Sequence, residues 1–345
     1  MAEITVYNNY EDFRIELKEN EGHFSISIEN YSGKSKNVII PASIGGIPVT
    51  AIGRYAFLHN EKLINVILPE GLLSIESSAF RDCVNLASIN FPQSLTSIEY
   101  DAFEDCEKLV NIVFPKGLVD IANDAFSGCK NLKDIVVDDQ NPVYASHDGI
   151  LCDKNLTTLI KYPEGRKGAY VVPESIVEIV SDAFDNCGKL TEITFPNDFM
   201  YILAYMFTGC KQLSKINVKK DNPRLSSING VLFNKKGDIL LKYPQNMKNA
   251  DYIVPDNVTH IAGSAFLECN CLNNIIIPEG LKFINECAFY KCRQLTAITL
   301  PISLLYIGGY AFDDCPNLKT VSLSRKTKFG YKAFEGFTGE IVYRD

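Results

Sequence analysis

Residues 86–106 read LASINFPQSLTSIEYDAFEDC, and close variants of this stretch recur along most of the chain. An Ala-Phe pair or its variant returns at steps of 22 or 23 residues, with two longer steps of 58 and 59. The phenylalanines of these copies are Phe57, Phe80, Phe103, Phe126, Phe184, Phe207, Phe266, Phe289, Phe312 and Phe334. A fixed period of about 20 to 50 residues is typical of a solenoid built from stacked units.

Each copy predicts one turn of such a solenoid. The segment Leu-x-x-Ile-x-apolar ends in alternating apolar positions, which predicts a short strand whose Ile and last apolar side chain face inward. Proline cannot donate to a β-ladder, so we expect the proline that follows to end the strand. These prolines stand at positions 41, 69, 92, 115, 173, 196, 255, 278 and 301. One unit cannot bury its apolar side alone, whereas stacked units form parallel sheet over a continuous core. We therefore expect a strand-dominated α/β repeat solenoid of about ten repeats.

The pattern L-x-x-I-x-L-P-x-x-L-x-x-I-x-x-x-A-F-x-x-C resembles the BspA-type leucine-rich repeat over residues 38–337. The resemblance implies a non-enzymatic protein-interaction scaffold without a cofactor. It further implies an adhesin-like surface protein of bacteria or protozoa that binds host or matrix proteins, located at the cell surface or secreted if a leader was removed. The N-terminus MAEITVYN shows no basic or apolar leader segment. If the chain is complete as given, the alternative is an intracellular adaptor in the cytoplasm.

The ends of the chain fall outside the period. In residues 1–37, apolar positions alternate at Phe13, Ile15 and Leu17 and again from Phe24 to Ile28, which predicts a hairpin that caps the first turn. We expect the solenoid over 38–337 and a final cap strand over 338–345.

Two long repeats carry related inserts at about 138–172 and 219–254. In each insert, turn residues separate two short apolar runs, so we expect a hairpin beside the solenoid in both. Gly149 matches Gly230 and Tyr162 matches Tyr243, which indicates turn and packing roles for these four residues.

Composition limits the function classes. Of the residues, 46% are apolar and 22% are charged, and the net charge is −8 with a pI of about 5.2. This acidic balance argues against non-specific binding to nucleic acid or anionic lipid. No window approaches 18 uninterrupted apolar residues, so we expect no membrane insertion. The expected partner is a protein.

Cysteine stands three residues after the phenylalanine in eight copies. These residues are Cys83, Cys106, Cys129, Cys187, Cys210, Cys269, Cys292 and Cys315. A recurring slot for a small side chain that can hydrogen-bond turn backbone indicates a structural ladder of buried, reduced thiols. Disulfides between neighbours are disfavoured because their Cβ vectors run parallel.

Catalytic and metal sites are remote alternatives. Cys271 and Cys287 lie near two ladder cysteines, but the cluster lacks a Cys-x-x-Cys pair, so we expect no metal site. His147 and Cys152 share an insert, yet no third group that would orient them is evident, so a thiol enzyme is the least favoured class. Carboxylates near the cysteine slots predict a solvated acidic row, with weak calcium binding as the alternative. They are Asp82, Glu104, Asp105, Asp185, Glu268, Asp313 and Asp314.

Candidate binding residues fall into two sets. The variable strand positions face outward and form an aliphatic patch at Ile64, Ile67, Val110 and Val113, followed by an amide and hydroxyl patch from Thr191 to Ser322. Aromatic residues outside the phenylalanine ladder gather near the inserts, and aromatic side chains are enriched in binding hot spots. They are Tyr144, Tyr170, Phe199, Tyr201, Tyr205 and Tyr252.

Overall fold

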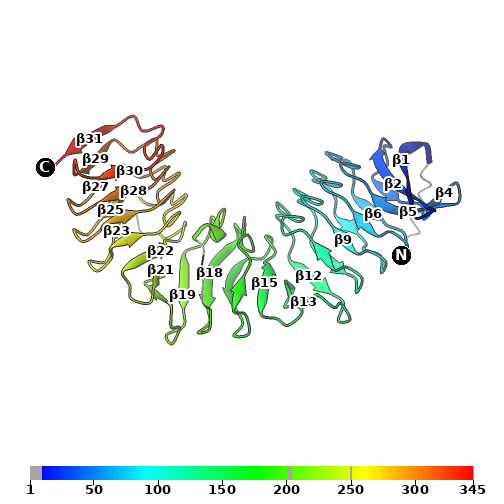
Figure 1. Cartoon of the computed structure of the whole chain (residues 1–345), viewed down its shortest axis with the longest axis horizontal. Coiled ribbons are helices and arrows are strands. Elements are labelled where there is room, and N and C mark those ends of the chain that lie inside the picture. The colour runs from blue at the N-terminus through cyan, green and yellow to red at the C-terminus, as the bar shows by residue number, and fades with distance from the viewer. Residues whose placement is uncertain (1–9, 200–201, 203, 249–250, 345) are drawn as a thin grey trace. The chain divides into compact units, whose positions relative to one another are not determined.

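The computed structural model describes residues 10–199, 202, 204–248 and 251–344. Within these residues the chain forms 31 β-strands, two 3₁₀-helices, η1 (Tyr10–Asp12) and η2 (Ala204–Phe207), and no α-helix. The strands stack into a strand-dominated parallel β-solenoid of about 14 turns, which confirms the predicted repeat fold (Figure 1). The turns outnumber the copies with an Ala-Phe pair because the N-terminal segment and the inserts add strands of their own.

The chain divides into two compact units. Unit 1 comprises Met1–Arg166 and Asp182–Cys187, and unit 2 comprises Lys167–Ser181 and Gly188–Asp345. Across the described ranges, no helix has both the length and the apolar character needed to cross a bilayer.

Unit 1 begins with an antiparallel hairpin of β1 (Phe13–Asn20) and β2 (His23–Tyr31). Its inner strand β2 buries Ile26 and Ile28, whereas Ile15 and Leu17 on the outermost strand β1 stay exposed. Strand β2 continues as a parallel sheet along one side of the unit. This sheet contains β5 (Ile47–Ile52) with β4 (Ser43–Ile44) paired to it, then β7 (Ser74–Ile75), β9 (Ser97–Ile98) and β11 (Asp120–Ile121).

The second sheet side of unit 1 contains the predicted motif strands. It is split into a three-stranded and a two-stranded sheet. These are β3 (Asn37–Ile39), β6 (Asn65–Ile67) and β8 (Ser88–Ile89), and β10 (Asn111–Phe114) with β12 (Asp134–Val137). The first insert forms antiparallel pairs among β13 (Tyr144–His147), β14 (Ile150–Asp153) and β15 (Thr158–Lys161).

Unit 2 repeats this plan. Its second insert again forms antiparallel pairs, and its parallel sheets run on to the last strand. One sheet contains β16 (Gly168–Val171), β18 (Leu190–Phe195) and β19 (Lys215–Val218), and a second contains β23 (Asp251–Ile253), β25 (Asn274–Ile276), β27 (Ala297–Thr299), β29 (Thr320–Leu323) and β31 (Glu340–Tyr343). The third contains β20 (Leu225–Ile228), β21 (Val231–Asn234), β22 (Ile239–Lys242), β24 (His260–Ile261), β26 (Phe283–Ile284), β28 (Tyr306–Ile307) and β30 (Lys328–Phe329), and the unit also includes β17 (Glu178–Ile179).

Stacked aromatic rings form the centre of both cores. In unit 1 the ring centroids of Phe80 and Phe103 lie 5.2 Å apart with planes inclined by 5°. In unit 2 those of Phe289 and Phe312 lie 5.0 Å apart at 4°. Tyr243 of the second insert joins this ladder, with its ring 5.1 Å from that of Phe266. The insert tyrosines are therefore packing residues, because each occupies a phenylalanine position.

The turns between the strands depend on residues in the left-handed backbone conformation. Positions two before and two after the phenylalanine have positive φ in most copies, for example Ser78 (φ 56°) and Asp82 (φ 58°) around Phe80. Gly128 (φ 74°) and Gly209 (φ 72°) occupy the second position in their copies. Two such residues within five positions prevent a helix, so hydrogen-bonded turns connect the strands.

Candidate binding surfaces

The ladder cysteines hold successive turns together from inside. The Cys83 thiol donates to the Phe57 carbonyl at 3.1 Å, and the Cys292 thiol donates to the Phe266 carbonyl at 3.0 Å. The same contact joins Cys106 to Phe80, Cys129 to Phe103, Cys187 to Tyr162, Cys269 to Tyr243 and Cys315 to Phe289. Burial raises the pKa of Cys83 to about 12, which keeps the thiol protonated as a donor. All eleven cysteines are free. The ladder therefore stiffens the scaffold and offers no reactive surface.

The outward face of the β6–β8 and β10–β12 sheets bears an apolar surface. We call it the aliphatic face and define it as Ile64, Ile67, Val110, Val113 and Val136. Ile67, Val113 and Val136 are 50%, 60% and 45% exposed. Each is the third residue of its strand, in β6, β10 and β12. Side chains alternate between the two faces of a strand, so the residue before each of these three, Val66, Ile112 or Ile135, points into the core.

A hollow of about 360 Å³ opens within the aliphatic face. It lies where β8 and β10 are not hydrogen-bonded to each other, and its lining includes Phe91, Phe114, Val113 and Val136. Asn90 takes the place that Ile67 and Val113 hold in neighbouring copies. Its amide accepts from the Leu68 N–H at 2.8 Å and donates to the Leu68 carbonyl at 3.0 Å. Because Asn90 turns toward β6, the space beside β10 stays open.

The predicted aromatic surface does not form a continuous patch. Phe199 is fully buried against Phe195, with ring centroids 4.7 Å apart, so its assignment to a binding surface was wrong. Tyr252 packs on Tyr243 at 4.8 Å and is half-buried. Tyr144 is also half-buried, and its hydroxyl accepts from the Ile121 N–H at 3.2 Å. These three rings contact the core and its turns, so they do not form an open binding surface.

The remaining aromatic predictions have separate outcomes. Tyr205 is 49% exposed, and Tyr170 on β16 is half-buried. Tyr201 lies outside the described residues. Among the described residues of the predicted aromatic set, Tyr205 is thus the one with an exposed side chain.

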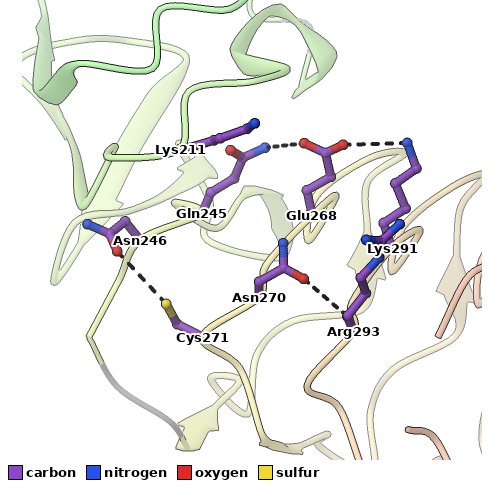
Figure 2. A pocket seen from close by; sticks show the side chains of 8 residues that line it. All are labelled: Lys211, Gln245, Asn246, Glu268, Asn270, Cys271, Lys291 and Arg293. Carbon is purple, nitrogen blue, oxygen red and sulfur yellow. Dashed lines mark hydrogen bonds and ion pairs between the residues drawn. The ribbon is translucent and has the colours of Figure 1, made fainter. Parts of the chain in front are cut away.

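A second hollow, of about 320 Å³ and polar, lies on the turn side of unit 2 (Figure 2). We call it the polar hollow and define it by Lys211, Gln245, Asn246, Glu268, Asn270, Cys271, Lys291 and Arg293. The second insert explains it. After Tyr243 the chain makes no Phe-x-x-Cys turn, and the Asn246 N–H donates to the Leu213 carbonyl at 2.8 Å. No sequence motif marked this hollow, because it arises from a turn that the insert lacks.

Comparison with known proteins agrees with this architecture. The model of the BspA type leucine rich repeat region matches residues 30–160, 169–250 and 242–343. The chain belongs to the BspA-type leucine-rich repeat family. No curated protein sequence matches it.

The chain is also similar to solved structures of leucine-rich repeat proteins at low sequence identity. The pneumococcal vaccine antigen PcpA is 19% identical, with a TM-score of 0.50, over 93% of this chain and 84% of that chain. A leucine rich cell surface protein from Faecalibacterium prausnitzii is 20% identical, with a TM-score of 0.49, over 96% and 95%. A leucine-rich repeat protein from Eubacterium ventriosum is 19% identical, with a TM-score of 0.46, over 92% and 72%.

The structure of this BspA-type chain does not support a catalytic thiol at Cys152 or a metal site. Cys152 is buried on β14, where burial raises its pKa to about 12, so it is not a nucleophile at neutral pH. In the described ranges, no three His, Cys, Asp or Glu side chains come together in a group that could hold a metal ion.

The acidic row is largely neutralised by basic neighbours. Arg81 contacts Glu104 at 2.8 Å, and Arg293 contacts Asp314 at 2.7 Å. Lys291 lies 3.6 Å from Glu268. Most of these carboxylates thus face basic side chains along the turns, and Asp82 and Glu104 both contact Arg81.

Proposed function

We propose that this BspA-type chain is a non-enzymatic scaffold that binds a protein partner through the aliphatic face of unit 1. The observation that carries the proposal is the exposure of Val113 and Val136 at a hollow with a mainly apolar lining, with Ile67 exposed on the same face. Fully burying one such side chain stabilises a complex by about 1.5–3 kcal/mol. A row of three beside a concavity is the kind of surface that a protein partner covers.

The β23–β31 sheet of unit 2 can be compared with the aliphatic face of unit 1. Ile253 and Ile276 are also exposed there, at 66% and 60%. On the next strands the equivalent positions are the polar residues Thr299 and Ser322, so the apolar row ends after β25. The aliphatic face of unit 1 thus combines apolar exposure with a concave shape, and we favour it for this reason.

Membership of the family supports a finer proposal, in which the partner is a host or extracellular matrix protein and the chain acts at the cell surface as an adhesin. The eleven free thiols favour a second candidate, an intracellular adaptor in a reducing compartment. Both candidates use the same face and differ in the source of the partner.

Binding to immobilised, purified extracellular matrix proteins, measured by surface plasmon resonance, tests the proposal. Val113→Glu should weaken binding at least about tenfold, because it places a charge where an apolar contact forms. Ile276→Glu is the matched control, because it changes an equally exposed strand residue of unit 2. Equal affinities for the two variants would exclude the aliphatic face. Binding confined to a cytosolic fraction would favour the adaptor.

A further inference from the structure

The polar hollow of unit 2 carries an inference that goes beyond the aliphatic face. Three cations line it, Lys211, Lys291 and Arg293, against one carboxylate, Glu268. Figure 2 shows Lys211 on the side of Gln245, and Lys291 and Arg293 beyond Glu268. The excess of positive charge contrasts with a chain whose net charge is −8.

The two long repeats differ in charge around an equivalent lysine. Lys130 in the first copy corresponds to Lys211 in the second, at the insert spacing. The positions of Asp105, Glu107 and Glu164 are taken in the second copy by Asn186, Gly188 and Gln245, so three carboxylates are replaced by uncharged residues while the lysine is kept.

The structure shows what this replacement does. Lys130 is neutralised, because its Nζ lies 2.6 Å from Glu107 Oε1 and 4.0 Å from Asp105 Oδ1. Among the described residues, Lys211 has no carboxylate within ion-pair distance and is exposed. A free lysine beside the hollow is therefore specific to the second copy.

The floor of the polar hollow is neutral and ordered. Gln245 is only 5% exposed, and its Nε2 donates to the Leu267 carbonyl at 3.3 Å and to Glu268 at 3.5 Å. Asn270 accepts from the Arg293 N–H at 3.4 Å. Asn246 and Asn270 are amides, which can both donate to and accept from a peptide backbone.

We infer that the polar hollow binds an acidic peptide segment of a partner protein, with a carboxylate held by Lys211 and Arg293 and the peptide backbone hydrogen-bonded by the neighbouring amides. Arg293 uses Nη2 for Asp314 and keeps further guanidinium N–H donors for a ligand. A volume of about 320 Å³ lies at the small end of ligand pockets, which suits one or two side chains and excludes a folded domain.

A fluorescently labelled hexaglutamate peptide tests this inference by fluorescence anisotropy with the intact chain. Lys211→Gln and Arg293→Gln should each weaken binding about tenfold, the loss expected for a charge-assisted hydrogen bond. Gln245→Glu should also weaken it, because this change restores the carboxylate of the first copy. Lys130→Gln is the matched control and should leave affinity unchanged. High salt should weaken binding, because the contacts are exposed.

Several results would overturn the assignment. Hexaglutamine binding as tightly as hexaglutamate would remove the role of charge, and unchanged affinity in Lys211→Gln and Arg293→Gln would move the peptide elsewhere. Inorganic phosphate that competes at the same concentration as the peptide would make this a small-anion site. Val113→Glu should bind the peptide normally, so failure of the aliphatic face and failure of the polar hollow are distinguishable. Thermal melting of each variant by circular dichroism verifies that it is folded.

Discussion

The thiol of Cys83 lies 3.1 Å from the backbone carbonyl of Phe57, one turn earlier in the solenoid. The same carbonyl also accepts from the Asn60 N–H within its own turn, at 3.1 Å. One oxygen thus closes a turn and links it to the next. Because the relationship recurs along both units, the repeated cysteine is a structural donor that adds a side-chain link to the backbone hydrogen bonds between turns.

Removal of one thiol donor should destabilise the chain measurably. Cys106→Ala deletes the hydrogen bond to the Phe80 carbonyl and leaves a small void, so we expect the free energy of unfolding to fall by about 1–2 kcal/mol. Cys106→Ser keeps a donor and should lose less. Urea denaturation measures both. Cys271→Ala, at an exposed position, should change stability by less than about 0.5 kcal/mol, and a loss equal to that of Cys106→Ala would contradict the ladder role.

Glycine should be favoured at the left-handed turn positions. Cys287 has φ 54°, a conformation that costs a residue with a Cβ about 1–2 kcal/mol. Glycine relieves this cost but loses about 0.5–1 kcal/mol of unfolded-state entropy, so Cys287→Gly should stabilise the chain by about 0.5–1 kcal/mol. Cys287→Ala keeps the Cβ and should be neutral. A thermal melt that ranks alanine above glycine would refute the argument.

The reverse change should be harmful. Gly128 has φ 74°, and a Cβ there would collide with the Asp105 carboxylate. Gly128→Ala should therefore lower the midpoint of thermal unfolding, both through backbone strain and through this contact. Gly71 also has a positive φ, of 95°, but nothing lies near its Cβ position, so Gly71→Ala isolates the strain. Equal losses in the two variants would show that the contact with Asp105 contributes nothing.

The stacked fold was predictable because the phenylalanines recur once per turn. Phe80 and Phe103, for example, are one turn apart in sequence and stack in the core, so their spacing gives the solenoid period. The left-handed positions were not predictable, because Ser78, Asp82 and Cys287 share a backbone conformation and no side-chain chemistry. Residue type identifies such a position only where glycine occupies it.

The candidate surfaces were predictable to different degrees. Alternation along a strand places Ile67 and Val113 outward, and the structure exposes both. Phe199 has the same residue type as an interface anchor, yet it is buried on Phe195, since composition near an insert does not determine which way a ring points. The polar hollow depends on the path of the chain after Tyr243, and no local pattern encodes that path.

Each insert is anchored by an asparagine whose four hydrogen bonds are all made. Asn141 is fully buried, and its Nδ2 donates to the carbonyls of Pro115 at 3.0 Å and Leu118 at 2.7 Å. Its Oδ1 accepts from the N–H groups of Val143 at 2.9 Å and Tyr144 at 2.8 Å. Asn222 makes the same four contacts in unit 2.

Asn141→Asp should therefore be strongly destabilising. The carboxylate cannot donate, so it would face two carbonyl oxygens as a buried charge, and we expect a loss of about 3–5 kcal/mol. Asn222→Asp should behave alike, because its contacts are equivalent. Asn273→Asp, at an exposed position just before β25, is the control, and urea denaturation of the three variants is the measurement. A similar midpoint for Asn141→Asp and Asn273→Asp would refute the anchoring role.

Glu164 should make stability depend on pH. It is buried, its Oε1 accepts from the Gly128 N–H at 2.8 Å, and Oε1 lies 3.8 Å from Lys161 Nζ. Burial raises the pKa of Glu164 from 4.5 to about 7, more than Lys161 lowers it. Between pH 4.5 and about pH 7, Glu164 is protonated in the folded chain and ionised in the unfolded chain. The free energy of unfolding should therefore fall as the pH rises from about 4.5 to about 7, by about 3 kcal/mol.

Glu164→Gln should remove this component, because an amide does not titrate. The second copy already has an amide, Gln245, at the equivalent position, so the fold accommodates the change. Urea midpoints measured between about pH 4 and pH 8 should decline for the natural chain and flatten for the variant, which becomes the more stable of the two near neutrality. Glu70→Gln, at an exposed turn position, controls for the loss of one negative charge. Parallel pH profiles for the natural chain and Glu164→Gln would show that Glu164 is already ionised across this range, with its charge compensated by Lys161.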